Sequence, residues 1–290
     1  MQNLRRLVIL IALTAPLSAM AIDVHALWDF SRPELSEQRF RDALATARGD
    51  DALILQTQIA RTYGLRRNFA QAQEILKSIE SQIQTAGAEA RIRHALEFGR
   101  TLISATHSPE SQSPETRERA RSAYLQALEL AKGHWLDDLT VDALHMLAFV
   151  DTAPAEQLKW GREALAIAES SSQTAAKRWE ASLRNNVGYA LHQLGRYPDA
   201  LSEFKKAVEL RERETNAEAT RAAHWMVAWT LRALDRLDEA LEIQLRLERE
   251  GDAAGDPDRY VFEELEAIYR AKEEPGRATR YAERKKGLSK

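Results

Sequence analysis

The sequence predicts an all-α protein built as a solenoid of paired helices, and three observations support this. Apolar residues make up 44% of the chain, charged residues 29% and aromatic residues only 7%, a balance typical of helical proteins. Between Asn185 and Leu210, the small residues Gly188 and Ala200 lie twelve positions apart, where two antiparallel helices can cross closely. Similar spacings recur on both sides of this stretch. Because one hairpin cannot bury its own apolar face, the recurrence predicts a stack of neighbouring hairpins.

The stretch from Asn185 to Leu210 also carries larger residues around the expected crossing. Leu191, Phe204 and Ala207 would fill the seam around the two small residues. This pattern resembles the tetratricopeptide repeat. The resemblance implies a right-handed superhelical solenoid of about six helical hairpins. It also implies that the first helix of each hairpin lines a concave groove, in which the protein binds a peptide or protein segment without catalysing a reaction.

The other elements follow in chain order. A capping helix is expected over 33–48, because Phe40, Ala43 and Leu44 share one face and Gly49 follows. The hairpins are predicted at approximately 52–86, 89–132, 139–171, 174–213, 217–250 and 257–288. The small residues expected at their helix crossings are Ala60 and Ala72, Gly99 and Ala120, Gly188 and Ala200, and Ala228 and Ala240. In the third hairpin, where the pattern is weakest, the aligned positions hold His145 and Gln157.

The turn of the second hairpin is longer than the others. Ala120 follows Gly99 by twenty-one positions rather than twelve, so the turn holds nine extra residues. Its segment 107–114 is polar and rich in serine and proline. Two interpretations stay open, a tolerated surface insertion and a functional lid, and the first is favoured because insertions in solenoids map to turns.

The first 21 residues have the pattern of a secretory signal peptide. Two arginines precede the apolar run 7–17, and Ala19 and Ala21 form an Ala-x-Ala cleavage site. An uncleaved membrane anchor is the alternative, but the run is short for a span and Pro16 interrupts it. Because the sequence has no cysteine, it cannot carry the lipid-modified cysteine of a lipoprotein. The prediction is an exported protein that is soluble in the periplasm or secreted, with no stable membrane insertion after cleavage.

No pattern of catalysis or metal binding is found in the sequence. It lacks a nucleophile elbow, a phosphate-binding loop, a His-Glu-x-x-His helix, Cys-x-x-Cys pairs and a dinucleotide-binding glycine motif. The seven histidines are dispersed, so no metal and no cofactor are expected. Acidic and basic residues are interleaved and give a net charge of −3, so nucleic acid is not an expected partner. The prediction is a non-enzyme, with an enzyme of unrecognised type as the more remote alternative.

The resemblance also implies which residues face the groove. In the family register the residue after each small position does so, which gives Arg61, Arg100, Met146, Tyr189 and Trp229. Neighbouring turns on the same helix faces add Asn185, His192, Trp225 and Arg232. The predicted groove is therefore cationic at its N-terminal end and aromatic at its C-terminal end.

Each end of the predicted groove has two interpretations. Trp225 and Trp229 either pack against the next hairpin or anchor a bound peptide, since exposed Trp, Tyr and Arg dominate interface energetics. Arg61 and Arg100 are either solvated or ion-paired, or they bind a carboxylate or another anion. The carboxylate clamp by which some family members bind chaperones is not expected, because its basic residues are missing from the hairpins on either side of Asn186.

The function that the resemblance favours is a scaffold or adaptor for a protein or peptide partner. The alternative is a solenoid that binds a small molecule or glycan through Trp225, Trp229 and Arg232. A shallow open groove would favour a peptide, whereas a closed pocket with convergent polar groups would favour a small ligand. Homo-oligomerisation through a terminal hairpin is left open by the sequence.

Overall fold

The computed structural model describes residues 22–108 and 112–288, and within them the chain forms helices and no strands. The helices are α1 (Val24–Leu27), α2 (Pro33–Leu44), α3 (Gly49–Leu65), α4 (Phe69–Ile83), α5 (Ala88–Leu102), α6 (Pro114–Gly133), α7 (Asp137–Val150), α8 (Pro154–Ser170), α9 (Thr174–Lys177), α10 (Glu180–Gln193), α11 (Tyr197–Arg211), α12 (Ala217–Ala233), α13 (Leu237–Ala254), α14 (Arg259–Ala271) and α15 (Pro275–Gly287). The predicted signal peptide, with Ala19 and Ala21, lies outside the described residues. None of the helices described is both long and apolar enough to span a bilayer.

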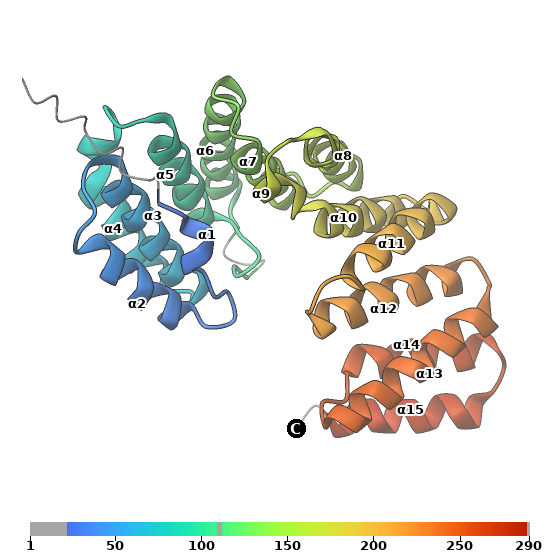
Figure 1. Ribbon diagram of the computed structural model, residues 1–290. Helices are drawn as coiled ribbons and strands as arrows, with labels where there is room; N and C mark the ends of the chain where they lie inside the picture. Colours follow the sequence, from blue (N-terminus) through green and yellow to red (C-terminus); the bar gives the residue numbers. More distant parts are fainter. Residues whose placement is uncertain (1–21, 109–111, 289–290) are drawn as a thin grey trace, which may run out of the picture.

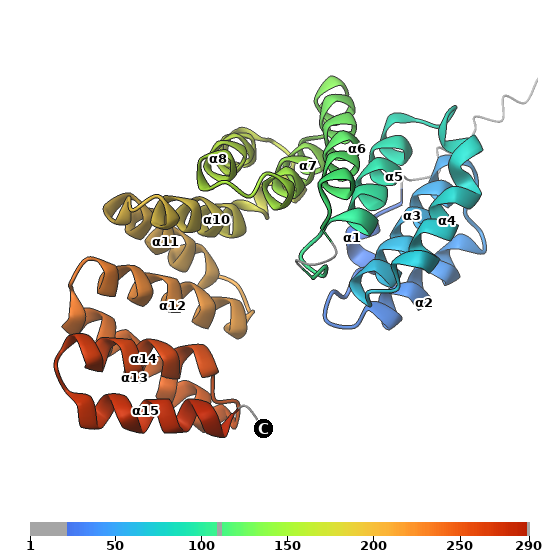
Figure 2. The same ribbon diagram turned by 180° about the vertical axis from the view of Figure 1, so that it is seen from behind.

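The helices pair in chain order, and the pairs stack into an arch (Figure 1). α3 packs on α4, α5 on α6, α7 on α8, α10 on α11, α12 on α13 and α14 on α15. The first helices of successive hairpins also contact one another: α3 contacts α5, α5 contacts α7, α10 contacts α12, and α12 contacts α14. Figure 2 shows the arch from behind, with α1–α5 on one limb and α12–α15 on the other. The predicted all-α solenoid of helical hairpins is confirmed.

Small residues let the two helices of a hairpin approach closely. A Cβ atom added to Gly99 would lie 2.5 Å from the ring of Tyr124, and one added to Gly188 would lie 2.7 Å from the ring of Phe204. Both rings are fully buried, so a larger residue at either glycine would force them to move. The remaining predicted crossing residues are buried as well, namely Ala60, Ala72, Ala120, Ala200, Ala228 and Ala240.

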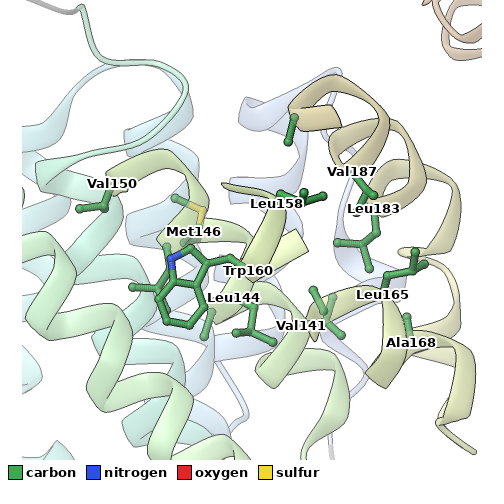
Figure 3. Packing of buried hydrophobic residues seen from close by; sticks show 14 of the residues in the cluster. Val141, Leu144, Met146, Val150, Leu158, Trp160, Leu165, Ala168, Leu183 and Val187 are labelled. Atoms are coloured by element: carbon green, nitrogen blue, oxygen red, sulfur yellow. The ribbon is translucent and has the colours of Figure 1, made fainter. Parts of the chain in front are cut away.

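The largest apolar core runs from α5 to α14. Figure 3 shows the part between α7, α8 and α10, where Val141 of α7 lies near Leu183 of α10 and Leu144 of α7 lies near Trp160 of α8. Trp160 of α8 belongs to the same core, and its Nε1 donates a hydrogen bond of 3.0 Å to Asp151 in the turn of the hairpin. Separate smaller clusters fill the two ends of the solenoid. The core therefore links successive hairpins, as expected of stacked repeats.

The N-terminal end differs from the sequence-based expectation. The capping helix expected over 33–48 ends at Leu44, because the chain turns before Gly49, which adopts a φ of +57° that glycine tolerates well. A short helix that was not predicted, α1, precedes it. Asp23 caps α1 by accepting hydrogen bonds from the backbone N–H groups of the next turn. The end of the solenoid thus contains more structure than one capping helix.

The fourth hairpin also differs in its first helix. Within the hairpin predicted at 174–213, the chain forms α9 and then α10, with a turn at Trp179 between them. The turn directs the Trp179 side chain toward α7, where its Nε1 donates a hydrogen bond of 2.8 Å to Asp138. This tertiary contact joins residues 41 positions apart, so local sequence does not indicate it.

Candidate functional site

The surface built by the first helices α3, α5, α7, α10 and α12 is called the groove face below. At its N-terminal end four charged side chains meet, and together they form the charge cluster: Arg61 of α3, Glu97 and Arg100 of α5, and Asp142 of α7. Arg100 donates to Glu97 Oε1 at 2.6 Å and pairs with Asp142. Arg61 Nη1 lies farther from these carboxylates, at 3.7 Å from Glu97 Oε1 and 4.0 Å from Asp142 Oδ2. Arg61 is therefore the more loosely paired of the two arginines.

The charge cluster is electrically balanced and largely buried. Side-chain exposure is 2% for Glu97, 7% for Asp142, 11% for Arg100 and 19% for Arg61. Burial would raise the pKa of Asp142, but the two guanidinium groups outweigh it and hold this pKa below its usual value. Burial also lowers the pKa of the adjacent His145 to about 4, so its imidazole is neutral near pH 7. Two guanidinium and two carboxylate groups leave the cluster without net charge.

A pocket of 160 Å³ lies over the charge cluster, and we call it the α3–α7 pocket. Its walls are mainly apolar and include Leu65, Met146, Phe149 and Trp179. The segment 104–106, just after α5, forms another side, and the Thr106 hydroxyl lies 3.5 Å from the Gly64 carbonyl oxygen. Within the described part of the chain, two buried polar atoms of residues that line this pocket have no hydrogen-bond partner, Arg61 Nε and Glu97 Oε2. The residues that line the pocket thus include apolar side chains and two side chains with a buried, unpaired polar atom.

Residues 22–32 cross the groove face at this end and form what we call the N-terminal strap. In the strap, Trp28 and Phe30 stack with 4.5 Å between ring centroids. The Arg61 guanidinium carbon lies 5.5 Å from the Trp28 centroid and 5.3 Å from the Phe30 centroid, a cation–π arrangement. Trp28 Nε1 also donates a hydrogen bond of 3.0 Å to Gln58 Oε1 of α3. The strap therefore fixes the position of Arg61.

The strap also reaches α7. His25 Nε2 lies 3.1 Å from Asp138 Oδ2, the carboxylate that also accepts the Trp179 hydrogen bond. A second pocket, of 230 Å³, lies between the strap and the groove-face residues below it. The N-terminal end of the groove face is thus covered rather than open.

At the C-terminal end of the groove face, aromatic side chains pack on one another. Trp229 of α12 stacks on His192 of α10 with 3.3 Å between ring centroids, and its centroid lies 6.0 Å from that of Tyr189. Trp225 lies 5.8 Å from Trp229, and its Nε1 donates a hydrogen bond of 3.1 Å to the Tyr260 carbonyl oxygen. Tyr189 is 42% exposed and Tyr260 is 66% exposed. These five residues form the aromatic stack, which is partly open to solvent.

The two other predicted residues at this end lie beside the stack. Asn185 is half-buried one helical turn before Tyr189. Arg232 donates from Nε to both carboxylate oxygens of Glu264, at 2.8 and 2.9 Å, so its charge is paired. Burial, together with the nearby Arg232, lowers the pKa of His192 to about 4. The imidazole in the stack is therefore neutral near pH 7.

The predicted groove residues form two groups that the structure keeps apart. The two N-terminal arginines meet in the charge cluster, and four of the predicted residues, Tyr189, His192, Trp225 and Trp229, meet in the aromatic stack. The expectation of a cationic N-terminal end is wrong, because buried carboxylates neutralise both arginines. The two tryptophans are half-buried, so they are neither core nor freely exposed. In residues 22–108 and 112–288, no group of three or more His, Cys, Asp or Glu side chains is placed to hold a metal ion.

Sequence reasoning missed the strap and one partner of the arginines. Glu97 lies two positions before Gly99, where the family register does not direct a side chain into the groove. Trp28 and Phe30 lie in an entry segment without helical periodicity. The presence of two aromatic residues in an otherwise irregular segment was the one available signal that it packs on the solenoid.

Comparison with known proteins gives a family match by sequence for one part of the chain and similar folds by structure for most of it. Residues 179–248 match the tetratricopeptide repeat. No curated protein matches the sequence. The fold is similar to that of a Signal Transduction ATPase with Numerous Domains from Pyrococcus horikoshii that has a tetratricopeptide repeat sensor, with 14% identity and a TM-score of 0.67 over 88% of this chain and 39% of that chain. It is also similar to a Rap protein complexed with Competence and Sporulation Factor, with 15% identity and a TM-score of 0.54 over 89% and 80% of the two chains. The chain spans about two fifths of the length of the ATPase.

Proposed function

We propose that this chain, a solenoid of tetratricopeptide-repeat type, is a non-catalytic scaffold that binds a peptide or protein segment on its groove face. The observation that carries the proposal is the aromatic stack, which joins α10, α12 and α14 and stays partly exposed. The similar Rap protein, solved in complex with Competence and Sporulation Factor, supports binding as a function of such a solenoid.

The aromatic stack has the physical properties of an interface anchor. Binding energy concentrates in Trp, Tyr and Arg residues, because an aromatic ring covers a large apolar area with few rotatable bonds. Here His192 and Tyr189 lie against Trp229, and a hydrogen bond to the backbone fixes the second indole. Rings that are held in place before binding lose little conformational entropy on binding. A partner segment with apolar side chains would gain most of its affinity at this stack.

The surroundings of the stack favour a peptide over a compact ligand. Tyr189 borders a pocket of 180 Å³ that it shares with Phe149 and Asn186. Trp225 and Tyr260 border another pocket, of 370 Å³, on the other side of the stack. A segment that crosses the stack could therefore place one side chain in each pocket, which is how grooves commonly obtain specificity.

We also propose that the protein is exported to the periplasm or secreted, which rests on the pattern of residues 1–21 alone. The test is to fractionate cells that express the chain and to determine its N-terminus by mass spectrometry. A chain that begins at Ile22 in the exported fraction is expected. A cytosolic chain that retains residues 1–21 would contradict export.

The binding proposal is tested by crosslinking capture with the native chain and two single variants as baits. Trp229→Ala removes the centre of the aromatic stack. Trp135→Ala is the matched control, because Trp135 is 82% exposed and lies in the turn before α7, away from the stack. The native chain and the control variant are expected to capture the same protein. The Trp229→Ala variant should bind that protein about 2 kcal/mol or more weakly in calorimetry.

Three outcomes would count against this proposal. Equal capture by all three baits, with helicity verified by circular dichroism, would show that the stack is not the anchor. Capture of no protein by the native chain would contradict a scaffold function. Binding of a glycan or small molecule at the stack, lost in Trp229→Ala, would favour the alternative ligand class.

A further inference from the structure

The α3–α7 pocket is a second candidate site, separate from the aromatic stack. Two polar atoms of residues that line it, Arg61 Nε and Glu97 Oε2, are buried without a hydrogen-bond partner in the described chain. Their side chains approach each other to 3.7 Å. A buried polar group without a partner costs free energy, and native proteins contain few of them. A ligand that supplies one acceptor and one donor would satisfy both atoms.

The charge of the surroundings restricts that ligand to a net-neutral one. Arg100 is already bonded to Glu97 Oε1 and Asp142, and the cluster sums to zero. A ligand with a single charge would leave one charge uncompensated in a largely buried place, which is costly. His145, whose neutral form is favoured by burial, does not offset an added negative charge near pH 7. A zwitterion adds an anionic acceptor and a cationic donor without changing the sum.

The size and lining of the pocket restrict the ligand further. A volume of 160 Å³ admits a small molecule and no helix or strand. Leu65, Phe149 and Trp179 give it an apolar wall, and the segment 104–106 closes another side. The ligand therefore needs a short apolar body next to its dipolar end.

We propose that the α3–α7 pocket binds a free α-amino acid with an apolar side chain. The α-carboxylate accepts a hydrogen bond from Arg61 Nε, and the α-ammonium donates to Glu97 Oε2. The apolar side chain packs against the wall formed by α3, α7 and Trp179. Both polar contacts are charge-assisted, the stronger kind of hydrogen bond. Trp28 and Phe30 of the strap act as positioning residues, because they hold the Arg61 guanidinium from the strap side.

The first arm of the test compares ligands on the native full-length chain by isothermal titration calorimetry. The probes are leucine and phenylalanine, together with three analogues of leucine. Leucinamide lacks the carboxylate, 4-methylpentanoate lacks the ammonium group, and N-acetyl-leucinamide carries neither charge. We expect at least one of the two amino acids to bind. For leucine, each analogue should bind about 10-fold or more weakly, because each loses at least one charge-assisted bond and leaves a buried partner unsatisfied.

Each other outcome of this arm overturns the proposal in a recognisable way. Equal binding of 4-methylpentanoate would show an anion site that does not use Glu97. Equal or tighter binding of N-acetyl-leucinamide would show a site for peptide backbone instead. Failure of both amino acids to bind would show that the pocket does not bind apolar amino acids.

The second arm uses variants that keep the shape of the site. Arg61→Lys keeps the positive charge but removes Nε, and Glu97→Gln keeps the size of the side chain but removes its charge. Each should weaken binding of the amino acid about 10-fold or more. Trp229→Ala is the matched control and should leave this affinity unchanged, since it lies in the other half of the groove face. Native affinity in Arg61→Lys would contradict the assignment.

The two proposals fail independently. Amino-acid binding is measured without any protein partner, and partner capture is scored with the Trp229→Ala variant. If Glu97→Gln does not fold, as judged by circular dichroism, the ligand comparison on the native chain still decides the proposal.

Discussion

The two ends of the groove face use the same structural positions for different chemistry. Arg61 and Arg100 directly follow the small crossing residues of their hairpins, and so do Tyr189 and Trp229. At the N-terminal end, carboxylates of α5 and α7 pair with the two arginines, and the strap lies against Arg61. At the C-terminal end, the rings pack on one another and remain partly open. Repeat register therefore sets where a residue points, but its tertiary neighbours decide whether it becomes a binding surface.

The largest expected difference between the two ends concerns their ion pairs. Asp142→Ala removes a carboxylate from the buried charge cluster and should cost about 3–5 kcal/mol in the free energy of unfolding, because it leaves guanidinium charge buried and unpaired. Glu264→Ala removes the partner of Arg232, which is 32% exposed and can be solvated, so about 1–3 kcal/mol is expected. Urea unfolding followed by circular dichroism measures both. Equal losses would contradict the contrast in burial.

Substitution of the glycine at a helix crossing should lower stability by a similar amount at both ends of the groove face. Gly99→Ala and Gly188→Ala each place a Cβ atom against a buried ring, at 2.5 and 2.7 Å, and each should cost about 1–3 kcal/mol of stability. Gly133→Ala is the matched control, because its Cβ atom meets nothing within 4 Å in α6 and alanine favours a helix, so no loss is expected. Thermal unfolding of the three variants checks this. A loss at only one crossing would show that the hairpins do not share one packing rule.

The aromatic stack should matter less for stability than for binding. Trp229→Ala removes ring contacts worth about 0.5–1.5 kcal/mol per pair from a half-buried position. Trp229 makes three such pairs, with Tyr189, His192 and Trp225, so the summed loss is about 1.5–4.5 kcal/mol and should not exceed that of Asp142→Ala. Its effect on partner affinity should be larger than that of Asp142→Ala. Urea unfolding and calorimetry with the captured partner give the two numbers for each variant. The reverse order would mean that the stack is core and the charge cluster is the partner site.

The smallest expected effect is a difference in pH dependence. The folded-state pKa values of His145 and His192 are both about 4, below the unfolded value near 6.5. Each histidine binds a proton more readily after unfolding, so its contribution to stability is present above pH 6.5 and is lost as pH falls toward 4. His145→Gln should therefore flatten the loss of stability between pH 6.5 and 4. His192→Gln should flatten this loss less, because its ring lies in the partly open stack. Identical profiles of stability against pH for the native chain and His145→Gln would contradict this account.

Residues that follow the repeat period were predictable, because packing within one hairpin is local in sequence. Gly188 and Phe204 lie in adjacent helices, so their spacing alone indicates the contact that the structure shows. The aromatic end of the groove followed from the same register, since Tyr189 and Trp229 occupy equivalent positions in successive hairpins.

The charge cluster, the strap and the pocket wall could not be predicted, because they depend on contacts between residues far apart in the chain. The pairing of Arg100 with Asp142 joins two hairpins through side-chain rotamers that repeat spacing does not fix. The strap carries no period, so nothing local indicated that Trp28 would lie over Arg61. For the long turn of the second hairpin, the sequence favours a surface insertion over a lid at segment 107–114. The residues just before that segment form part of a pocket wall, which the repeat period does not indicate.

The most direct test of the contrast is hydrogen–deuterium exchange of the full chain, free and bound to its captured protein partner. The account predicts slower exchange on binding in α10 and α12, around Tyr189 and Trp229, with no change in α3 and α5 around Arg61 and Arg100. Addition of the amino-acid ligand should protect α3 and α5 instead. Protection by the protein partner centred on α3 and α5, with α10 and α12 unchanged, would contradict the division of the groove face.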